Sequence, residues 1–281
     1  MNTLLFALFA CGEKNEDTGF FDSVEDTDTE DTDTEDTSDT SDTETDNPDS
    51  TGLELVGTYT DNWLGSHTIT EEIWDTGPGY VFNISQYDNS AGYLLAQNDE
   101  NNDPQYGNPG KWSKFQWTLN ENGGLYYCQS IYDAATEEDA MGANGNPADL
   151  SAGCSGFSWT ELRGNMNLHG DYVDDYGTPH SINPFTWVMG TEPSVFHISE
   201  YSNDDGYALA QNDEANEWSP GLYSKFEWTT DTDGTWFYCQ SAYNAETLED
   251  AKNTSSDSSN LETGCGEMGA AWSALNATGA Q

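Results

Sequence analysis

Four of the five cysteines in this 281-residue chain form two equally spaced pairs, and no other feature constrains the fold as strongly. Cys128 and Cys154 are 26 positions apart, and so are Cys239 and Cys265. The sequence around the first cysteine of each pair also recurs, as LYYCQSIY and then as WFYCQSAY. Repetition of this kind indicates two homologous domains, each closed by its own disulfide.

The repetition extends well beyond the cysteines. We place the first repeat at residues 53–162 and the second at residues 166–275. The pentapeptide AQNDE occurs at residues 96–100 and recurs unchanged at residues 210–214. The chain therefore contains two copies of one domain of about 110 residues, a length that can bury a modest core.

Each repeat has the pattern of a β domain. Alternating apolar and polar residues rich in Tyr, Trp, Phe and Ile predict strands, and Asn-Gly and Asp-Gly pairs predict hairpin turns. About seven strands are expected per repeat, the last of the first repeat at residues 156–162, with one short helix at residues 134–141 or 245–251. We predict an all-β fold of two tandem antiparallel domains, each with one short helix and one disulfide. An up-and-down barrel is preferred to a sandwich.

One segment resembles a known family. Residues 55–69, LVGTYTDNWLGSHTI, are similar to the opening strand and turn of avidin-type and lipocalin-type barrels, with a Gly-x-aromatic start followed by a Leu-Gly-Ser turn. The second repeat departs from this pattern, with YGTP at residues 176–179. The resemblance implies a meander of strands and does not identify a ligand.

The chain is extremely acidic. With 52 Asp and Glu against 6 Lys and Arg, its formal net charge is −46. Such a surface repels phosphate backbones, so nucleic acid is excluded as a partner, whereas divalent cations and cationic surfaces are compatible with it. Residues 11–52 consist largely of Asp, Glu, Thr and Ser, a composition that predicts a disordered acidic tether.

The fifth cysteine follows a short apolar run. Leu8, Phe9 and Ala10 precede Cys11, and this pattern resembles the lipobox of bacterial lipoproteins, although the leader lacks the usual basic residues. The resemblance implies a signal peptide at residues 1–10, lipidation of Cys11 and anchoring to a membrane. Gly12, in place of Asp, implies the outer membrane or the cell surface, with a periplasmic orientation as the alternative. Paired cysteines independently indicate an oxidising compartment.

Several polar residues recur at equivalent positions and are candidates for binding. A lysine stands near an aromatic residue in both copies, which suits recognition of a carboxylate or a sugar, or the lysine neutralises a nearby aspartate. Amide and carboxylate side chains follow the predicted strand before it, and they either hold calcium or terminate the strand through turn hydrogen bonds. The binding candidates are Gln97, Asn98, Asp99, Trp112, Lys114, Gln211, Asn212, Asp213, Tyr223 and Lys225. The calcium candidates are Asp99, Glu100, Asp213 and Glu214, and no other cofactor is expected.

His67 and His180 are the histidines that correspond between the copies. A single histidine per repeat, without a second histidine or a free thiol at ligand spacing, is more typical of a hydrogen-bonded structural residue than of a zinc ligand or a general base. We retain both as binding candidates. No catalytic residues are predicted, because the chain has no nucleophile motif.

The sequence therefore favours a surface or periplasmic lipoprotein with a duplicated module that binds a glycan or a protein partner. The many aromatic residues allow for an exposed stacking surface. A hydrolase that acts on glycans and a purely structural envelope protein are the alternatives. The oligomeric state is left open.

Overall fold

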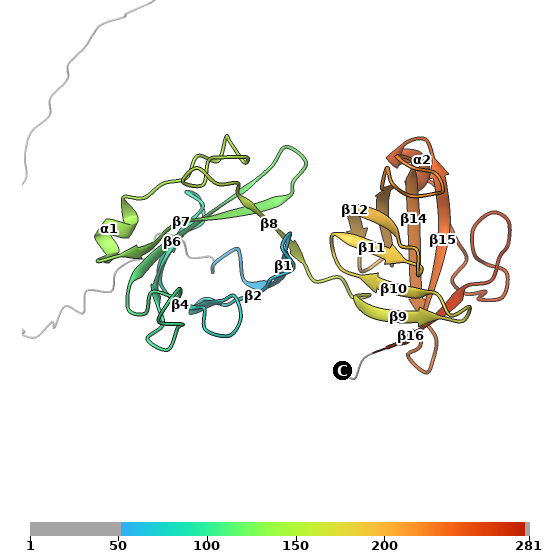
Figure 1. The fold of residues 1–281 in the computed structure, drawn as a ribbon, viewed down its shortest axis with the longest axis horizontal. Coiled ribbons are helices and arrows are strands. Elements are labelled where there is room, and N and C mark those ends of the chain that lie inside the picture. Colours follow the sequence, from blue (N-terminus) through green and yellow to red (C-terminus); the bar gives the residue numbers. More distant parts are fainter. Residues whose placement is uncertain (1–51, 279–281) are drawn as a thin grey trace, which may run out of the picture. The chain divides into compact units, whose positions relative to one another are not determined.

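The computed structural model describes residues 52–278, which form two closed antiparallel β-barrels of eight strands each (Figure 1). In both barrels every strand pairs with its neighbours in the chain and the last strand pairs with the first. The predicted signal peptide, lipidation site and tether lie outside the described residues.

The first barrel contains eight strands and one helix, which follows the seventh strand. They are β1 (Gly57–Asp61), β2 (Ser66–Ile69), β3 (Ile73–Asp75), β4 (Val81–Asp88), β5 (Tyr93–Asn98), β6 (Trp112–Leu119), β7 (Leu125–Ala134), α1 (Glu137–Met141) and β8 (Thr160–Gly164).

The second barrel repeats this order. Its elements are β9 (Gly170–Asp174), β10 (Pro179–Ile182), β11 (Thr186–Met189), β12 (Ser194–Ser202), β13 (Tyr207–Asn212), β14 (Tyr223–Thr230), β15 (Trp236–Ala245), α2 (Leu248–Lys252) and β16 (Ser273–Ala277).

The all-β prediction is confirmed, and the barrel alternative is the correct one. Three details were wrong. Each domain has eight strands rather than about seven, and the last strand of the first barrel begins at Thr160 rather than at residue 156. Each helix also begins three residues later than expected, at Glu137 and at Leu248, because the preceding strand extends to Ala134 or Ala245. The residues before β8 form a tight turn, in which Cys154 bridges to Phe157. The sequence pattern did not distinguish that turn from a strand, because apolar and polar residues follow one another in both.

Large side chains fill the interior of each barrel. In the first barrel, Trp74 is fully buried and stacks on Phe115 with ring centroids 4.5 Å apart. In the second, Trp187 stacks on Phe226 at 4.4 Å. The segment before the first strand adds two apolar side chains to each core, Leu53 and Leu55 or Met166 and Leu168. An eight-stranded barrel packed in this way has a solid core rather than an internal ligand chamber.

A glycine in the turn after β4, and its counterpart after β12, explains why Gly-Tyr recurs there. Gly92 and Gly206 have φ angles of 64° and 65°, which favour glycine. A Cβ atom on either would lie 2.6 or 2.5 Å from the carbonyl oxygen of Trp117 or Trp228 on the adjacent strand. The close approach of these two backbones therefore requires glycine.

A second, smaller apolar cluster lies on the outer side of each barrel. In the second barrel it consists of the buried residues Leu209, Ala242 and Ala251 with partly buried neighbours. Leu209 alternates along β13 with Ala208 and Ala210, which belong to the interior core, so it points outward. Helix α2 covers this outer cluster.

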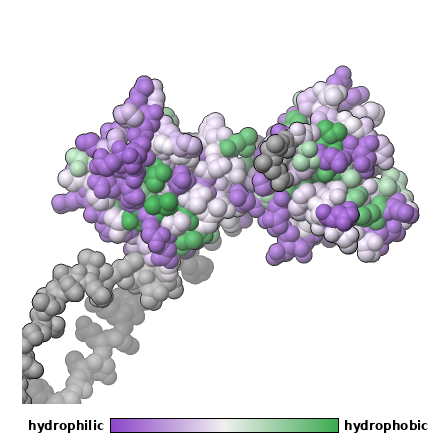
Figure 2. All heavy atoms as spheres, turned by 90° about the horizontal axis from the view of Figure 1, so that it is seen from below, coloured by the Kyte–Doolittle hydropathy of each residue, from purple (hydrophilic) through white to green (hydrophobic). Residues whose placement is uncertain are grey.

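Several aromatic side chains are exposed, and most of them occupy similar places in the two copies, whereas Phe157 corresponds to the exposed Met268. They are Trp63, Tyr106, Tyr132 and Phe157 in the first barrel and Tyr176, Trp218 and Tyr243 in the second. Figure 2 shows small hydrophobic areas among hydrophilic ones on the face that it presents. Among residues 52–278, no helix has the length and hydrophobicity needed to cross a membrane.

Candidate functional site

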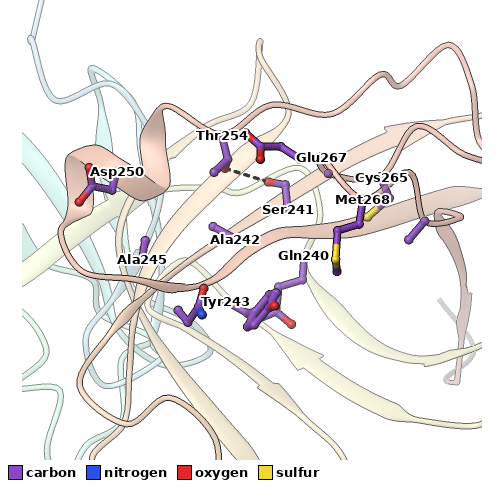
Figure 3. A pocket seen from close by; sticks show the side chains of 13 residues that line it. Gln240, Ser241, Ala242, Tyr243, Ala245, Asp250, Thr254, Cys265, Glu267 and Met268 are labelled. Carbon is purple, nitrogen blue, oxygen red and sulfur yellow. Dashed lines mark hydrogen bonds between the residues drawn. The ribbon is translucent and has the colours of Figure 1, made fainter.

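The best candidate site is a groove on the outer side of the second barrel. It lies between β15, α2 and the loop that carries Cys265, and it has a volume of about 370 Å³ (Figure 3). Its apolar lining includes Ala242, Tyr243 and Met268, and its polar lining includes Gln240 and Asn244. We refer to it as the β15 groove. Its volume is at the lower end of the range of about 300–1,000 Å³ typical of small-molecule sites.

Irregularities in β15 shape the floor of this groove. Lys225 on β14 pairs with Ala242, whereas the next residue, Phe226, pairs with Gln240. Ser241 is therefore an extra residue in β15, and a second register shift lies between Tyr223 and Lys225. Such bulges bend a strand and redirect side chains, and they are frequent beside binding sites.

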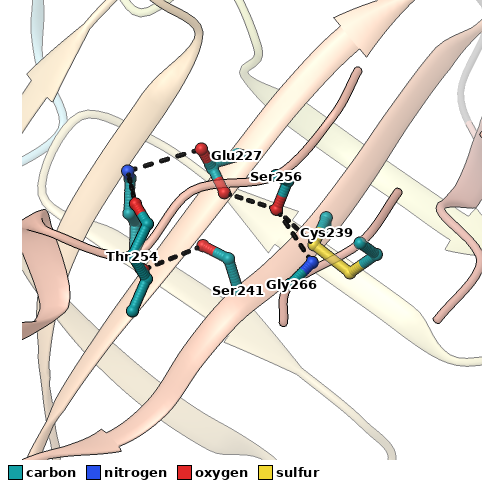
Figure 4. The surroundings of a disulfide bond; sticks show 8 residues. Glu227, Cys239, Ser241, Thr254, Ser256 and Gly266 are labelled. Carbon is teal, nitrogen blue, oxygen red and sulfur yellow. Dashed lines mark hydrogen bonds and ion pairs between the residues drawn. A yellow bond between two sulfur atoms is a disulfide. The ribbon is translucent and has the colours of Figure 1, made fainter. Parts of the chain in front are cut away.

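A chain of polar contacts holds the disulfide loop over β15 (Figure 4). Lys225 Nζ lies 3.3 Å from the carboxylate of Glu227, and that carboxylate accepts a hydrogen bond of 2.6 Å from Ser256 Oγ. Ser256 Oγ in turn accepts from the backbone N–H of Gly266 at 3.1 Å. The chain connects the barrel wall to the residue next to Cys265, so the disulfide is not the only link that positions the loop.

Two positions differ between the copies in a way that opens the groove in the second barrel. Ile131 of β7 pairs with Lys114 as Ala242 of β15 pairs with Lys225, so the second copy has the smaller side chain. Ser155 and Gly266 both follow the second cysteine and both have a positive φ, 51° and 63°.

The second of these positions decides how much space remains above the strand. In the first barrel, Ser155 Oγ donates a 3.1 Å hydrogen bond to the carbonyl of Ser130. In the second barrel, a Cβ atom on Gly266 would lie 3.6 Å from the carbonyl oxygen of Ser241, the counterpart of Ser130. The serine side chain thus occupies the space that glycine leaves open.

Polar groups in the groove are available to a ligand. Among the described residues, the Tyr243 hydroxyl, the Asn244 amide and the Glu267 carboxylate form no hydrogen bond, and all three residues are exposed. Asp250 accepts from Thr247 Oγ1 through one oxygen, which leaves the other free. A groove that combines an aromatic ring with amide and carboxylate groups is suited to a polar ligand with a flat face.

The two lysines singled out in the sequence are buried and do not line an open groove. Lys114 Nζ donates to Met141 O and to Asn144 Oδ1, both at 2.9 Å, and Lys225 Nζ donates to Lys252 O and Thr254 O. Each lysine therefore caps carbonyls at the C-terminal end of the short helix, where a cation is favourable.

These contacts do not support the alternative role of the two lysines, which was to neutralise Asp99 or Asp213. Burial lowers the pKa of Lys114. The aromatic neighbour is Tyr93, whose ring centroid is 4.9 Å from Lys114 Nζ. Trp112 and Tyr223 instead pack against the outer apolar clusters.

The amide candidates hold the loop that follows β5 or β13. Asn98 is buried and donates to the carbonyls of Gly107, Asn108 and Tyr132, while its Oδ1 accepts from Ser113. Its counterpart Asn212 donates to Ser219 O and Tyr243 O and accepts from Ser224. The exposed Gln97 and Gln211 donate to Gly110 O and Gly221 O. These amides therefore have structural partners.

The carboxylates proposed for calcium also contact neighbouring groups. Asp99 accepts from the backbone N–H of Asn101, and this bond together with those from the Asn101 and Asn83 amides lowers its pKa. Asp213 accepts from His197 at 2.7 Å, and this contact is the main reason that its pKa is lowered. Glu100 and Glu214 lie against Gly110 and Gly221. No cluster of three or more His, Cys, Asp or Glu suited to a metal occurs within residues 52–278, and calcium binding stays a prediction.

His67 and His180 belong to a buried hydrogen-bonded chain that recurs in both cores. Trp74 Nε1 donates to His67 Nδ1 at 3.0 Å, and His67 Nε2 lies 3.0 Å from Asp61 Oδ2. Because the indole N–H can only donate, Nδ1 must be the acceptor, and the ring proton is on Nε2 and faces the aspartate. Trp187, His180 and Asp174 repeat the arrangement at 3.0 and 3.5 Å. Both histidines are thus structural.

Acid is expected to weaken the second barrel through His180. Burial lowers the pKa of His180 below its unfolded value of about 6.5, although Asp174 acts in the opposite direction. The unfolded chain therefore binds more protons, and this contribution to stability is present above pH about 6.5 and decreases as the pH falls. A His180→Gln variant can keep both hydrogen bonds without titrating. We expect its unfolding free energy to vary less between about pH 7 and 5, by up to about 1.4 kcal/mol per pH unit.

Denaturant unfolding at several pH values measures this difference. His197→Gln is the matched control, because that histidine is exposed. The stated role of His180 is wrong if the wild type and His180→Gln have the same pH slope. Asp174 acts at lower pH: burial raises its pKa, but hydrogen bonds from Thr178, Tyr176, His180 and Tyr238 outweigh this and lower it.

The disulfides join Cys128 to Cys154 and Cys239 to Cys265, as predicted. The residues of the β15 groove were not predicted from sequence. One signal was present: at Ile131 and Ala242 the two copies differ within an otherwise well-matched segment. The sequence could not reveal that this position lies opposite Ser155 or Gly266.

The fold and the groove define a class: a duplicated, solid-cored β-barrel with an external groove beside a disulfide loop. Comparison with protein-family models, curated protein sequences and solved structures gave no match.

Proposed function

We propose that this chain is a glycan-binding lipoprotein of the bacterial envelope, with its binding site in the β15 groove. The observation that carries the proposal is the groove itself, whose lining combines the exposed Tyr243 ring with the Asn244 amide and the Glu267 carboxylate, both without a hydrogen-bond partner among residues 52–278. Sugars stack one face on an aromatic ring and use their hydroxyls to bond such polar groups. The solid cores favour an external site over an internal one.

The location is part of the same proposal. Lipidation of Cys11 would anchor the chain in the outer membrane, and the acidic segment at residues 11–52 would hold the barrels away from the bilayer. The two disulfides support an oxidising compartment. A tethered binding domain of this kind raises the effective concentration of its ligand near the surface.

Tyr243→Ala is expected to weaken glycan binding by the full chain about tenfold or more, because an aromatic stacking contact contributes about 1.4 kcal/mol. The measurement is binding to a glycan array, followed by titration calorimetry with the best ligand. Tyr132→Ala is the matched control, since Tyr132 occupies the same position in the first barrel.

A double variant tests whether glycan binding requires the open groove. Ala242→Ile with Gly266→Ser introduces the residues of the first barrel and is expected to abolish binding. Gly266 already has the backbone conformation that Ser155 adopts, so the change is compatible with the fold. The proposal fails if no glycan binds, or if both variants bind as the wild type does.

The hydrolase alternative has one observation in its favour, since Asp250 and Glu267 both line the groove. Both carboxylates are exposed, whereas the general acid of a glycosidase is usually placed in an apolar environment. Mass spectrometry of the bound glycan after long incubation separates the two functions. Intact glycan supports binding alone, and cleavage products would contradict it.

A further inference from the structure

The charged side chains that line the β15 groove are all acidic. Asp250 comes from α2 and Glu267 from the disulfide loop, and no Lys, Arg or His lines the groove as described (Figure 3). Both carboxylates are exposed, and their negative charges attract a cation that enters the groove. The groove therefore has the charge pattern of a cation site rather than of an anion site.

The nearest basic side chains do not cancel this charge. Lys225 is buried beneath the loop, where its ammonium bonds two backbone carbonyls and faces Glu227. Lys252 at the end of α2 forms an ion pair of 2.6 Å with Glu200. Both ammonium groups thus have other partners, and Glu267 has none among the described residues.

The uncharged lining also suits a cation. The ring of Tyr243 can accept an ammonium group on its face, and the thioether of Met268, 84% exposed, offers a polarisable contact. The acidic surface of the whole chain attracts cations and repels anionic sugars such as sulfated ones. Ring, thioether and carboxylates consequently favour the same charge on the ligand.

We propose that the β15 groove selects amino sugars whose amine is free and protonated, with the ammonium directed to Glu267 and the sugar packed against Tyr243. This inference rests on the glycan-binding function proposed above. The Asn244 amide lines the same groove and has no hydrogen-bond partner among residues 52–278, so it can bond a sugar hydroxyl. The Gln240 amide instead donates to the buried Ser224 Oγ at 3.1 Å. A lysine side chain of a peptide would satisfy the Glu267 carboxylate but would leave the Asn244 amide without a partner.

The test compares two probes with the same sugar backbone, one with a free amine and one with the amine acetylated and therefore uncharged. Short oligomers of glucosamine and of N-acetylglucosamine are titrated into the full chain at mildly acidic pH, where the free amine is protonated. We expect glucosamine oligomers to bind about tenfold more tightly, with a preference that decreases as salt is added. Glu267→Gln is expected to reduce their affinity about threefold to fivefold, as loss of an exposed ion pair does. It should reduce N-acetylglucosamine binding less, because the glutamine amide can still bond a sugar hydroxyl but cannot pair with an ammonium group.

Glu262→Gln is the matched control, because Glu262 is an exposed carboxylate in the same loop that does not line the groove. Equal binding of the two oligomers would overturn the charge preference and leave the glycan-binding proposal intact. Binding of neither oligomer, with no hit on the array, would overturn both. Tight binding of a lysine-rich peptide in place of glucosamine would assign the groove to a protein partner and contradict the inference.

Discussion

Replacing Trp187 with Ala is expected to lower the free energy of unfolding of the second barrel by about 3–5 kcal/mol. This side chain is fully buried, stacks on Phe226 and donates to His180 Nδ1. Its removal leaves a large cavity and a buried acceptor without its donor, and both effects destabilise the fold. Urea denaturation followed by circular dichroism measures the change.

Trp218→Ala provides the matched control, because Trp218 is 75% exposed and its removal should change stability by no more than about 0.5 kcal/mol. Trp74→Ala should affect the first barrel as Trp187→Ala affects the second. If Trp187→Ala costs as little as Trp218→Ala, the hydrogen-bonded chain of tryptophan, histidine and aspartate does not stabilise the core.

Removing the disulfide of the second barrel, by Cys239→Ala with Cys265→Ala, is expected to cost about 3–4 kcal/mol of unfolding free energy. The bond closes a loop of 26 residues that includes α2, and the unfolded chain gains conformational freedom when it is cut. The loop also borders the β15 groove, so we expect ligand affinity to fall with stability.

Replacing Cys128 and Cys154 with Ala separates the effect of a lost disulfide on stability from its effect on ligand binding. It should destabilise the first barrel by a similar amount, because its loop has the same length, and it should leave ligand binding unchanged. Thermal and urea unfolding of both variants give the comparison. A second barrel as stable without the bond as with it would show that the contacts from Lys225 to Gly266 hold the loop unaided.

Much of the fold could be predicted because its signals are local. Alternation along residues 112–119 predicts a strand with Phe115, Trp117 and Leu119 on one side, and β6 has these bounds, with Phe115 and Trp117 in the core. Leu119 shares their side of the strand, yet it is 63% exposed because it lies at the end of the strand. Alternation assigns a side of the sheet and does not show where the sheet ends.

The candidate site was harder to predict, since recurrence in two copies marks structural residues as readily as functional ones. Asn98, Lys114 and His67 recur because they secure a loop, a helix end and a core. The groove instead depends on residues at which the copies differ. Without the three-dimensional structure, the difference between Ile131 and Ala242 cannot be told from ordinary sequence divergence between the copies.

The sequence by itself determined the duplication, the all-β meander and the pairing of four cysteines, because equal spacing and period-two alternation follow from neighbours along the chain. Only the tertiary structure decided where a ligand could bind. Whether space remains above β15 depends on residue 266, which is 25 positions away from Ser241 and is a glycine. It also depends on bulges in the strand that the local sequence pattern does not predict. The barrel brings these positions together, and one missing Cβ then leaves the groove open.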